Sequence, residues 1–262
     1  MKQVFTELTM EQIKQAAPTV FQTSPKSHLS ENYVHIPTNK VVEDMIQLGW
    51  KPCQAVEVKA RAKKNKGYQR HMVKFFNPDI VIEGKNGDDV YPQILLTNSH
   101  DGLSSFKFQI GLFRLVCSNG LVVMDTSYGD FKLRHMGYTF SELQTKVAEA
   151  TTAFPGLVEK INEFQQVELS DWQVKKFAEG AALVRFGDSV KVDINELLGV
   201  DRIEDSGNNL WAVFNRVQEK LINGDCSYTM GAKTRKARAI KNFNMDLKIN
   251  EALWTLAEEY VK

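Results

Sequence analysis

The spacing of apolar residues changes along this chain from a period of two to a helical period, and the change falls near Gly137. Before that point, short apolar runs alternate with polar residues and are separated by turn residues, which is typical of antiparallel strands. The clearest run covers residues 106–112, where every second residue from Phe106 onward is apolar. After Gly137, apolar residues recur every three or four positions, as on one face of a helix. A sheet followed by helices predicts an α+β fold and argues against the alternating βαβ order of a Rossmann fold.

The same change of period divides the chain. We expect residues 1–137 to form a mostly antiparallel β-sheet with hairpins and one or two short helices. Residues 138–262 are expected to form a helical region that packs on the sheet as one compact unit. The 262 residues correspond to one large domain or two small ones, and 43% of them are apolar, which is enough to bury a sizeable core.

Turn residues and helix signals define the expected elements of the first region. Thr38 and Gly49 are a helix start and a helix stop around an apolar stripe. Strands are expected over residues 33–36, 55–60, 68–76, 80–82, 90–97, 106–112, 121–124 and 131–135. Pro92 argues against a central position for its strand, because proline cannot donate to a ladder.

Four helices are expected in the second region. Two capping boxes, Ser141–Gln144 and Ser170–Gln173, mark helix starts. The first helix should run to about residue 166 and break or kink at Pro155. The other two are expected over residues 209–223, with Gly224 as the stop, and over residues 247–260.

Charge and cysteine content exclude several classes of protein. The formal net charge is +1, so any nucleic-acid surface has to come from an uneven placement of charge. Three widely spaced cysteines without a Cys-x-x-Cys pair argue against a disulfide scaffold or a zinc knuckle and fit a reducing compartment. The N-terminus lacks a signal-peptide core, and no apolar run approaches the ~20 residues that span a bilayer. We therefore expect a soluble cytoplasmic protein that does not bind a membrane.

A first basic segment runs from Val58 to Pro78 without a single acid. Tyr68 and Phe75 are interleaved with its cations. On a hairpin, such a segment is suited to tracking a phosphate backbone and stacking on bases. The residues expected to contact nucleic acid here are Lys59, Arg61, Lys63, Lys64, Lys66, Tyr68, Arg70 and Lys74.

A second acid-free segment runs from Ser227 to Met245. If it forms a helix, cations three positions apart share one face only approximately. The expected contacts here are Lys233, Arg235, Lys236, Arg238 and Lys241. Either segment alone also fits an ordinary solvated turn or helix, but the two together in a nearly neutral chain favour binding of a polyanion.

Two polar corners flank the clearest strand: Asn98–Gly102 precedes it and Cys117–Gly120 follows it. A straight strand would hold them roughly 35–40 Å apart, so a single site built from both corners is not expected. Both corners also fit plain turns, in which Asn and Asp side chains bond to the backbone and glycine adopts a positive φ.

Two kinds of active site stay open as alternatives. A nucleophilic Cys117 would need His71, His100 or His135 and an adjacent cation. A metal site would have to gather His71, His100, Asp101 and His135, which show none of the short spacings usual among metal ligands. The glycine motifs that bind phosphate are absent as well. We therefore expect no catalytic residue, no metal and no cofactor, and we favour a protein that is not an enzyme.

The central block resembles the phage/plasmid-like protein family known as domain of unknown function 932. The resemblance rests on Asn98-Ser99-His100-Asp101-Gly102, on Arg114-Leu115-Val116-Cys117-Ser118-Asn119-Gly120 and on Arg134-His135. It covers roughly residues 25–240. Because the family is known from phages, prophages and plasmids, the resemblance implies a protein of the bacterial host cell that acts near DNA replication, recombination or antirestriction. It assigns no activity, so it leaves open the role of the motif residues Asn98, His100, Asp101, Arg114, Cys117, Asn119 and His135.

The resemblance and the two basic segments together predict a DNA-binding protein of a phage or plasmid. Single-stranded DNA binding or annealing in replication and recombination is its most concrete form, and a homo-oligomer fits that role. One alternative is an antirestriction or antidefence protein that binds a host protein. A second alternative is a metal-dependent nuclease or hydrolase that uses His100, Asp101 and His135.

Overall fold

The computed structural model describes residues 5–27, 29, 33–60, 65–82, 89–114, 120–123, 131–133 and 138–261. The chain forms two compact units: Met1–Leu115 with Thr126–Phe154, and Val116–Asp125 with Pro155–Lys262. Strands come first and helices later, which confirms the α+β fold. The units divide between Phe154 and Pro155, inside a helix, whereas the sequence suggested a division at residue 137.

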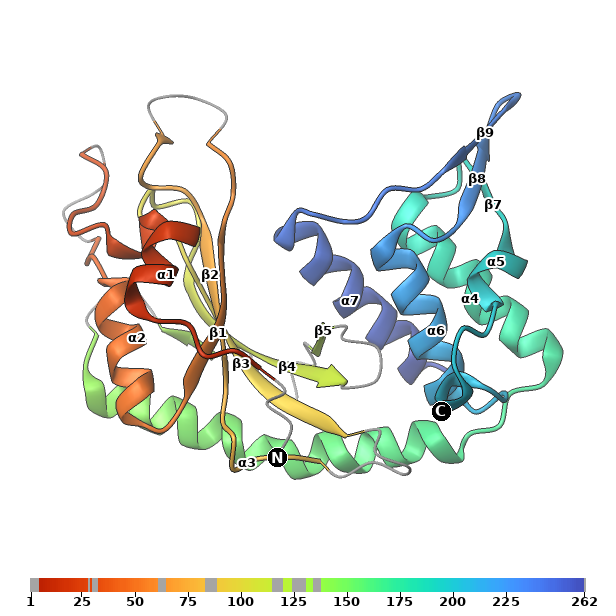
Figure 1. Cartoon of the computed structure of the whole chain (residues 1–262), viewed down its shortest axis with the longest axis horizontal. Coiled ribbons are helices and arrows are strands. Elements are labelled where there is room, and N and C mark those ends of the chain that lie inside the picture. The colour runs from red at the N-terminus through yellow and green to blue at the C-terminus, as the bar shows by residue number, and fades with distance from the viewer. Residues whose placement is uncertain are drawn as a thin grey trace. The chain divides into compact units, whose positions relative to one another are not determined.

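The first unit is built on antiparallel strands that follow one another in chain order across a sheet (Figure 1). They are β1 (Lys51–Glu57), β2 (His71–Phe76), β3 (Val90–Asn98) and β4 (Phe106–Arg114), and a short strand β6 (Phe131–Leu133) pairs with β4. The alternate residues from Phe106 to Leu112 are buried, as predicted. Gln109, on the opposite face of β4, is buried too, so both faces of the sheet are covered at that point.

Pro92 lies in a central strand, because β3 pairs with both β2 and β4. The ladder with β2 ends at the pair Phe76–Gln93, whereas the ladder with β4 continues to Val90. Pro92 therefore has a neighbouring strand on one side only. The sheet tolerates the missing N–H there for the same reason that an edge strand does.

Two of the expected strands are not regular strands. Residues 33–36 run without a ladder to any strand among the described residues. Ile82 makes a single bridge to Val90, and the turn expected over residues 84–87 lies outside the described residues. The segment of residues 33–36 has another use, since the Tyr33 hydroxyl donates to the carbonyl of Ser99.

The first unit also holds short helices against its sheet (Figure 1). These are α1 (Met10–Ala16), the 3₁₀ helix η1 (Pro18–Phe21) and α2 (Thr38–Gln47). As predicted, a short helix ends before Gly49, whose φ is +86°, but Thr38 is the first residue of α2 and not its N-cap, which is Pro37. The Thr38 hydroxyl does not cap the helix; it is used in the interior of the unit, as described below.

Helix α3 (Phe140–Gln166) corrects two expectations. Its cap is Thr139, whose hydroxyl accepts the N–H of Glu142, and not Ser141. It also continues through Pro155 without a break. Proline removes one helical hydrogen bond, and the remaining bonds and the packing of a long helix outweigh that loss.

The second unit contains helices α4 (Asp171–Phe186), α5 (Ile194–Leu198), α6 (Leu210–Asn223) and α7 (Phe243–Glu258), the 3₁₀ helix η4 (Ile203–Asp205), and strand β5 (Gly120–Val123) against α7. Its small antiparallel sheet has the order β7 (Lys191–Val192), β8 (Ser227–Met230) and β9 (Lys233–Lys236). The capping box at Ser170 and the stop at Gly224 are confirmed. No helix in the described part of the chain combines the length and apolar character needed to cross a membrane.

Candidate nucleic-acid interface

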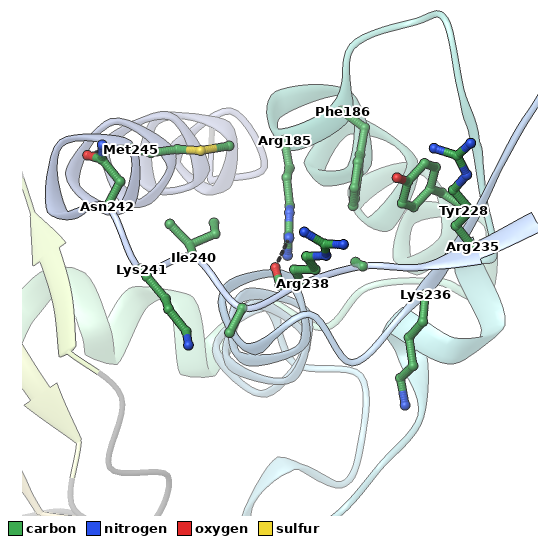
Figure 2. A pocket seen from close by; sticks show the side chains of 12 residues that line it. Arg185, Phe186, Tyr228, Arg235, Lys236, Arg238, Ile240, Lys241, Asn242 and Met245 are labelled. Carbon is green, nitrogen blue, oxygen red and sulfur yellow. Dashed lines mark hydrogen bonds between the residues drawn. The ribbon is translucent and has the colours of Figure 1, made fainter. Parts of the chain in front are cut away.

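A recess of about 770 Å³ lies in the second unit, and its lining combines cationic side chains with aromatic and apolar ones (Figure 2). Its walls are formed by Arg185, Phe186, Tyr228, Arg235, Lys236, Ala237, Arg238, Ala239, Ile240, Lys241, Asn242 and Met245. Five of these residues are Arg or Lys, and none is acidic. The recess is therefore a concentration of positive charge in a chain whose net charge is only +1.

Most of these residues come from the second basic segment, which is not a helix. Lys233–Lys236 form β9, which pairs with β8 from Ser227 to Met230. The segment of residues 237–242 then runs to the start of α7. Two backbone hydrogen bonds anchor it: the N–H of Ala237 donates to the carbonyl of Cys226, and the N–H of Ile240 donates to the carbonyl of Ile222.

Gly224 allows this segment to approach closely. It ends α6 in the left-handed region, at φ +81° and ψ +25°. A Cβ atom at this position would lie 2.5 Å from the carbonyl carbon of Arg238 and 2.7 Å from the nitrogen of Ala239. A Cβ atom essentially never lies this close to an atom to which it is not bonded. Only glycine therefore permits the segment that carries Arg238 to pack here.

Arg185, at the end of α4, joins the helix to that segment. Its Nη2 donates to the carbonyl of Arg238 (Figure 2). Its guanidinium carbon lies 4.8 Å from the centre of the Phe186 ring. Burial lowers the pKa of the Arg185 guanidinium, and its Nη1 is buried with no hydrogen-bond partner among the described residues. A half-buried cation that has no carboxylate partner among the described residues favours an anionic ligand nearby.

Aromatic side chains continue the wall on one side of Arg185. The Phe186 and Tyr228 rings have centroids 5.2 Å apart, at an angle of 33°. In Figure 2, Lys236 and Lys241 extend away from Arg185, and their ammonium groups lie outside this central group. The recess thus combines the Arg185 guanidinium, which lies against the Phe186 ring, with the more distant ammonium groups of two lysines.

The N-terminus of α7 adds to the positive potential. Asn242 caps this helix, since its Oδ1 accepts the N–H groups of Asn244 and Met245. The N-terminal end of a helix carries roughly half a positive charge. Both the backbone dipole and the side chains therefore favour an anion at this place.

The structure brings together most of the residues that we expected from the second basic segment. Arg235, Lys236, Arg238 and Lys241 line the recess, while Lys233 is exposed on β9 outside it. Arg185, Phe186 and Tyr228 were missed. Tyr228 belongs to the acid-free segment itself and was available as a signal, but Arg185 and Phe186 come from α4, far earlier in the chain.

The first basic segment belongs to the first unit and is less uniform. Lys59 and Lys66 are exposed, Tyr68 and Arg70 are half-buried, and Arg61, Lys63 and Lys64 lie outside the described residues. Lys74 lies in β2 with only 8% of its surface exposed. Lys74 therefore offers the least surface to a polyanion among the described residues predicted in this segment.

The first polar corner is buried and belongs to a cluster of histidines. Asn98 and His100 are fully buried, as is His71 on the neighbouring strand. The rings of His71 and His100 have centroids 5.0 Å apart, and those of His35 and His100 are 4.6 Å apart. Sequence reasoning named His71 and His100 but missed His35, which stands in the segment of residues 33–36.

Backbone and hydroxyl groups hold these rings in place. His100 Nε2 lies 3.1 Å from the carbonyl of Thr19, and His35 Nε2 lies 3.0 Å from that of Gln22. Asn98 Nδ2 donates to the Thr38 hydroxyl, which lies 2.9 Å from Nε2 of His71. Hydrogen bonds of this kind between buried polar groups help to specify the packing of the unit.

Asp101 continues the corner as a turn. Its carboxylate accepts the hydroxyl of Ser99 and the N–H of Leu103. Gly102 follows with a φ of +77°. These contacts agree with the interpretation of this corner as a turn built by an Asp side chain and a glycine.

Of the other motif residues, the structure describes only one. Arg114 ends β4, and Cys117, Asn119 and His135 lie outside the described residues. Over the part of the chain that the structure describes, no three His, Cys, Asp or Glu side chains are arranged to hold a metal ion. Asn98 and His100 are buried hydrogen-bonding groups of the fold, and Asp101 is partly exposed.

Comparisons with known proteins place the chain among proteins without an assigned activity. The family model described as "Domain of unknown function (DUF932)" matches residues 25–254. Two proteins of Escherichia coli (strain K12), the UPF0380 proteins YfjQ and YafZ, are each 32% identical to it; the alignments cover 96% of this chain and 90% of each relative. No solved structure matches the chain. Neither relative's name states a ligand or a reaction.

Proposed function

The chain belongs to the DUF932 family, whose description names no function, and from the chemistry of its own recess we propose that it binds single-stranded DNA there. One observation carries the proposal. Five cations and no acid surround a single recess that also has aromatic and apolar walls. Annealing, a role in recombination, a homo-oligomeric state and a cytoplasmic location stay predictions from the sequence.

The charged groups suit a phosphate backbone. Arg235 and Arg238 are exposed, and the planar guanidinium group of arginine matches phosphate geometry with two parallel hydrogen bonds. The exposed Lys236 and Lys241 add point charges along the rim. Neutralised phosphates release counterions, so such binding weakens steeply as salt rises.

The aromatic and apolar groups favour a single strand over a duplex. Stacking between bases and aromatic side chains contributes about 1–3 kcal/mol per base in proteins that bind single strands. A duplex keeps its bases inside the stack and offers only phosphates and groove edges. Phe186, Tyr228 and Met245 would find no partner on a duplex backbone.

We expect the double reversal Arg235→Glu/Arg238→Glu to weaken single-stranded DNA binding by at least about tenfold at moderate salt. Loss of two phosphate contacts should also make the plot of log affinity against log salt shallower by about 1.4. Fluorescence anisotropy of a labelled oligothymidylate over a salt series measures both quantities. A parallel series with duplex DNA gives the strand preference.

The control is Lys175→Glu/Lys191→Glu, which changes the net charge equally at exposed positions of the same unit that do not line the recess. It should retain most of the affinity and the original salt dependence. Equal losses in the two double variants would mean that only net charge matters. Absence of binding to single strands by the unaltered protein would overturn the proposal.

A further inference from the structure

The recess has an apolar side as well as a charged one. Ile240 and Met245 line it, and Met245 is 45% exposed although it is a large apolar residue. In Figure 2 these two side chains lie on one side of Arg185, and the Phe186–Tyr228 pair lies on the other. A volume of about 770 Å³ falls within the range of about 300–1,000 Å³ typical of sites for small organic groups. Phosphates alone would need no apolar wall.

A polar group with hydrogen-bonding capacity lies beside that apolar side. Asn242 uses its Oδ1 to cap α7. Its Nδ2 makes no hydrogen bond to the described residues and lies on the lining of the recess as a double donor. The carbonyl oxygens of nucleobases are acceptors of the kind that an amide N–H₂ recognises.

Taking these features together, we propose that the recess receives one unstacked base of the bound strand, which packs against Met245 and Ile240 while the adjacent phosphates lie on Arg235 and Arg238. This inference rests on the proposed binding of single-stranded DNA. It adds that a base, and not only the phosphate backbone, enters the recess. A base of a single strand is available at little cost, since it has no pairing to lose. Asn242 Nδ2 and the Arg185 guanidinium then face the edge of the base and its phosphate.

The test compares two strands of equal length and charge, oligothymidylate and the same backbone with abasic sugars. We expect the abasic strand to bind at least about tenfold more weakly, because even one base–protein contact of this kind contributes about that factor. Met245→Ser should weaken binding of oligothymidylate toward the abasic value and leave binding of the abasic strand unchanged. Fluorescence anisotropy at one fixed salt concentration provides all four dissociation constants.

Met230→Ser is the matched control. Met230 is an exposed methionine on β8 of the same unit, 48% exposed, and it does not line the recess. It should leave both affinities unchanged. Equal affinities for the two strands, or equal effects of the two methionine variants, would overturn the inference while DNA binding stands. Failure of both strands to bind would overturn the proposed function and the inference with it.

Discussion

Gly224→Ala is expected to abolish DNA binding and to destabilise the protein by roughly 2–5 kcal/mol. The left-handed conformation of Gly224 costs a residue with a Cβ roughly 1–2 kcal/mol. The added Cβ would also overlap the backbone of Arg238 and Ala239, where no flexible side chain can move aside. The segment of residues 237–242 would have to leave α6, and the recess would open. Urea unfolding monitored by circular dichroism measures the first effect and anisotropy with oligothymidylate the second.

Gly207→Ala is the matched control, because it introduces the backbone strain of a positive φ without a steric clash of the added Cβ. Gly207 has a similar φ of +92°, but a Cβ there would meet nothing within 4 Å. We expect this variant to lose only roughly 1–2 kcal/mol and to keep its affinity for DNA. A Gly224→Ala protein as stable as Gly207→Ala, with unchanged binding, would show that the contact between Gly224 and Arg238 does not hold the recess.

Local signals in the sequence predicted those elements whose formation depends on neighbouring residues. The alternation along residues 106–112 placed the buried face of β4 correctly, and Ser170 and Gly224 mark the ends of their helices. Predictions failed where tertiary contacts decide. Helix α3 continues through Pro155 without the predicted break. The central strand β3 accommodates Pro92 because its ladder with β2 stops at Gln93, one residue before the proline.

The candidate site was predictable in composition but not in geometry. The acid-free stretch after residue 226 contains most cations of the recess, yet its spacing did not indicate which secondary structure would carry them. Pairing with β8 and packing against α6 made it a strand and an anchored segment instead. Arg185 and Phe186 carry no local signal, since only the packing of α4 brings them to this place. His35 joins His100 for the same reason.

Buried His71 is expected to make the protein lose stability in mild acid. Nδ1 of His71 lies 3.1 Å from the Gln69 carbonyl, which can only accept, so Nδ1 carries the proton and Nε2 accepts the Thr38 hydroxyl. Burial lowers the pKa of His71 from 6.5 to about 4, and the hydrogen bond to the Gln69 carbonyl and the charge of Asp101 offset this only in part. The unfolded chain therefore takes up a proton near pH 6.5 that the folded chain excludes until about pH 4. The resulting stabilisation is present above pH 6.5 and is lost as the pH falls from 6.5 to 4.

His71→Gln should remove this dependence, since the amide keeps a donor and an acceptor but does not titrate. At about 1.36 kcal/mol per pKa unit, we expect the free energy of unfolding of the unaltered protein to lose about 3 kcal/mol more than that of the variant between pH 7 and pH 4. Urea unfolding at several pH values gives both curves, and carboxylates that titrate in both proteins cancel in the difference. The unaltered protein should be the more stable one at pH 7, and the gap should close toward pH 4. A gap that stays constant over this range would mean that His71 is not held neutral by its burial.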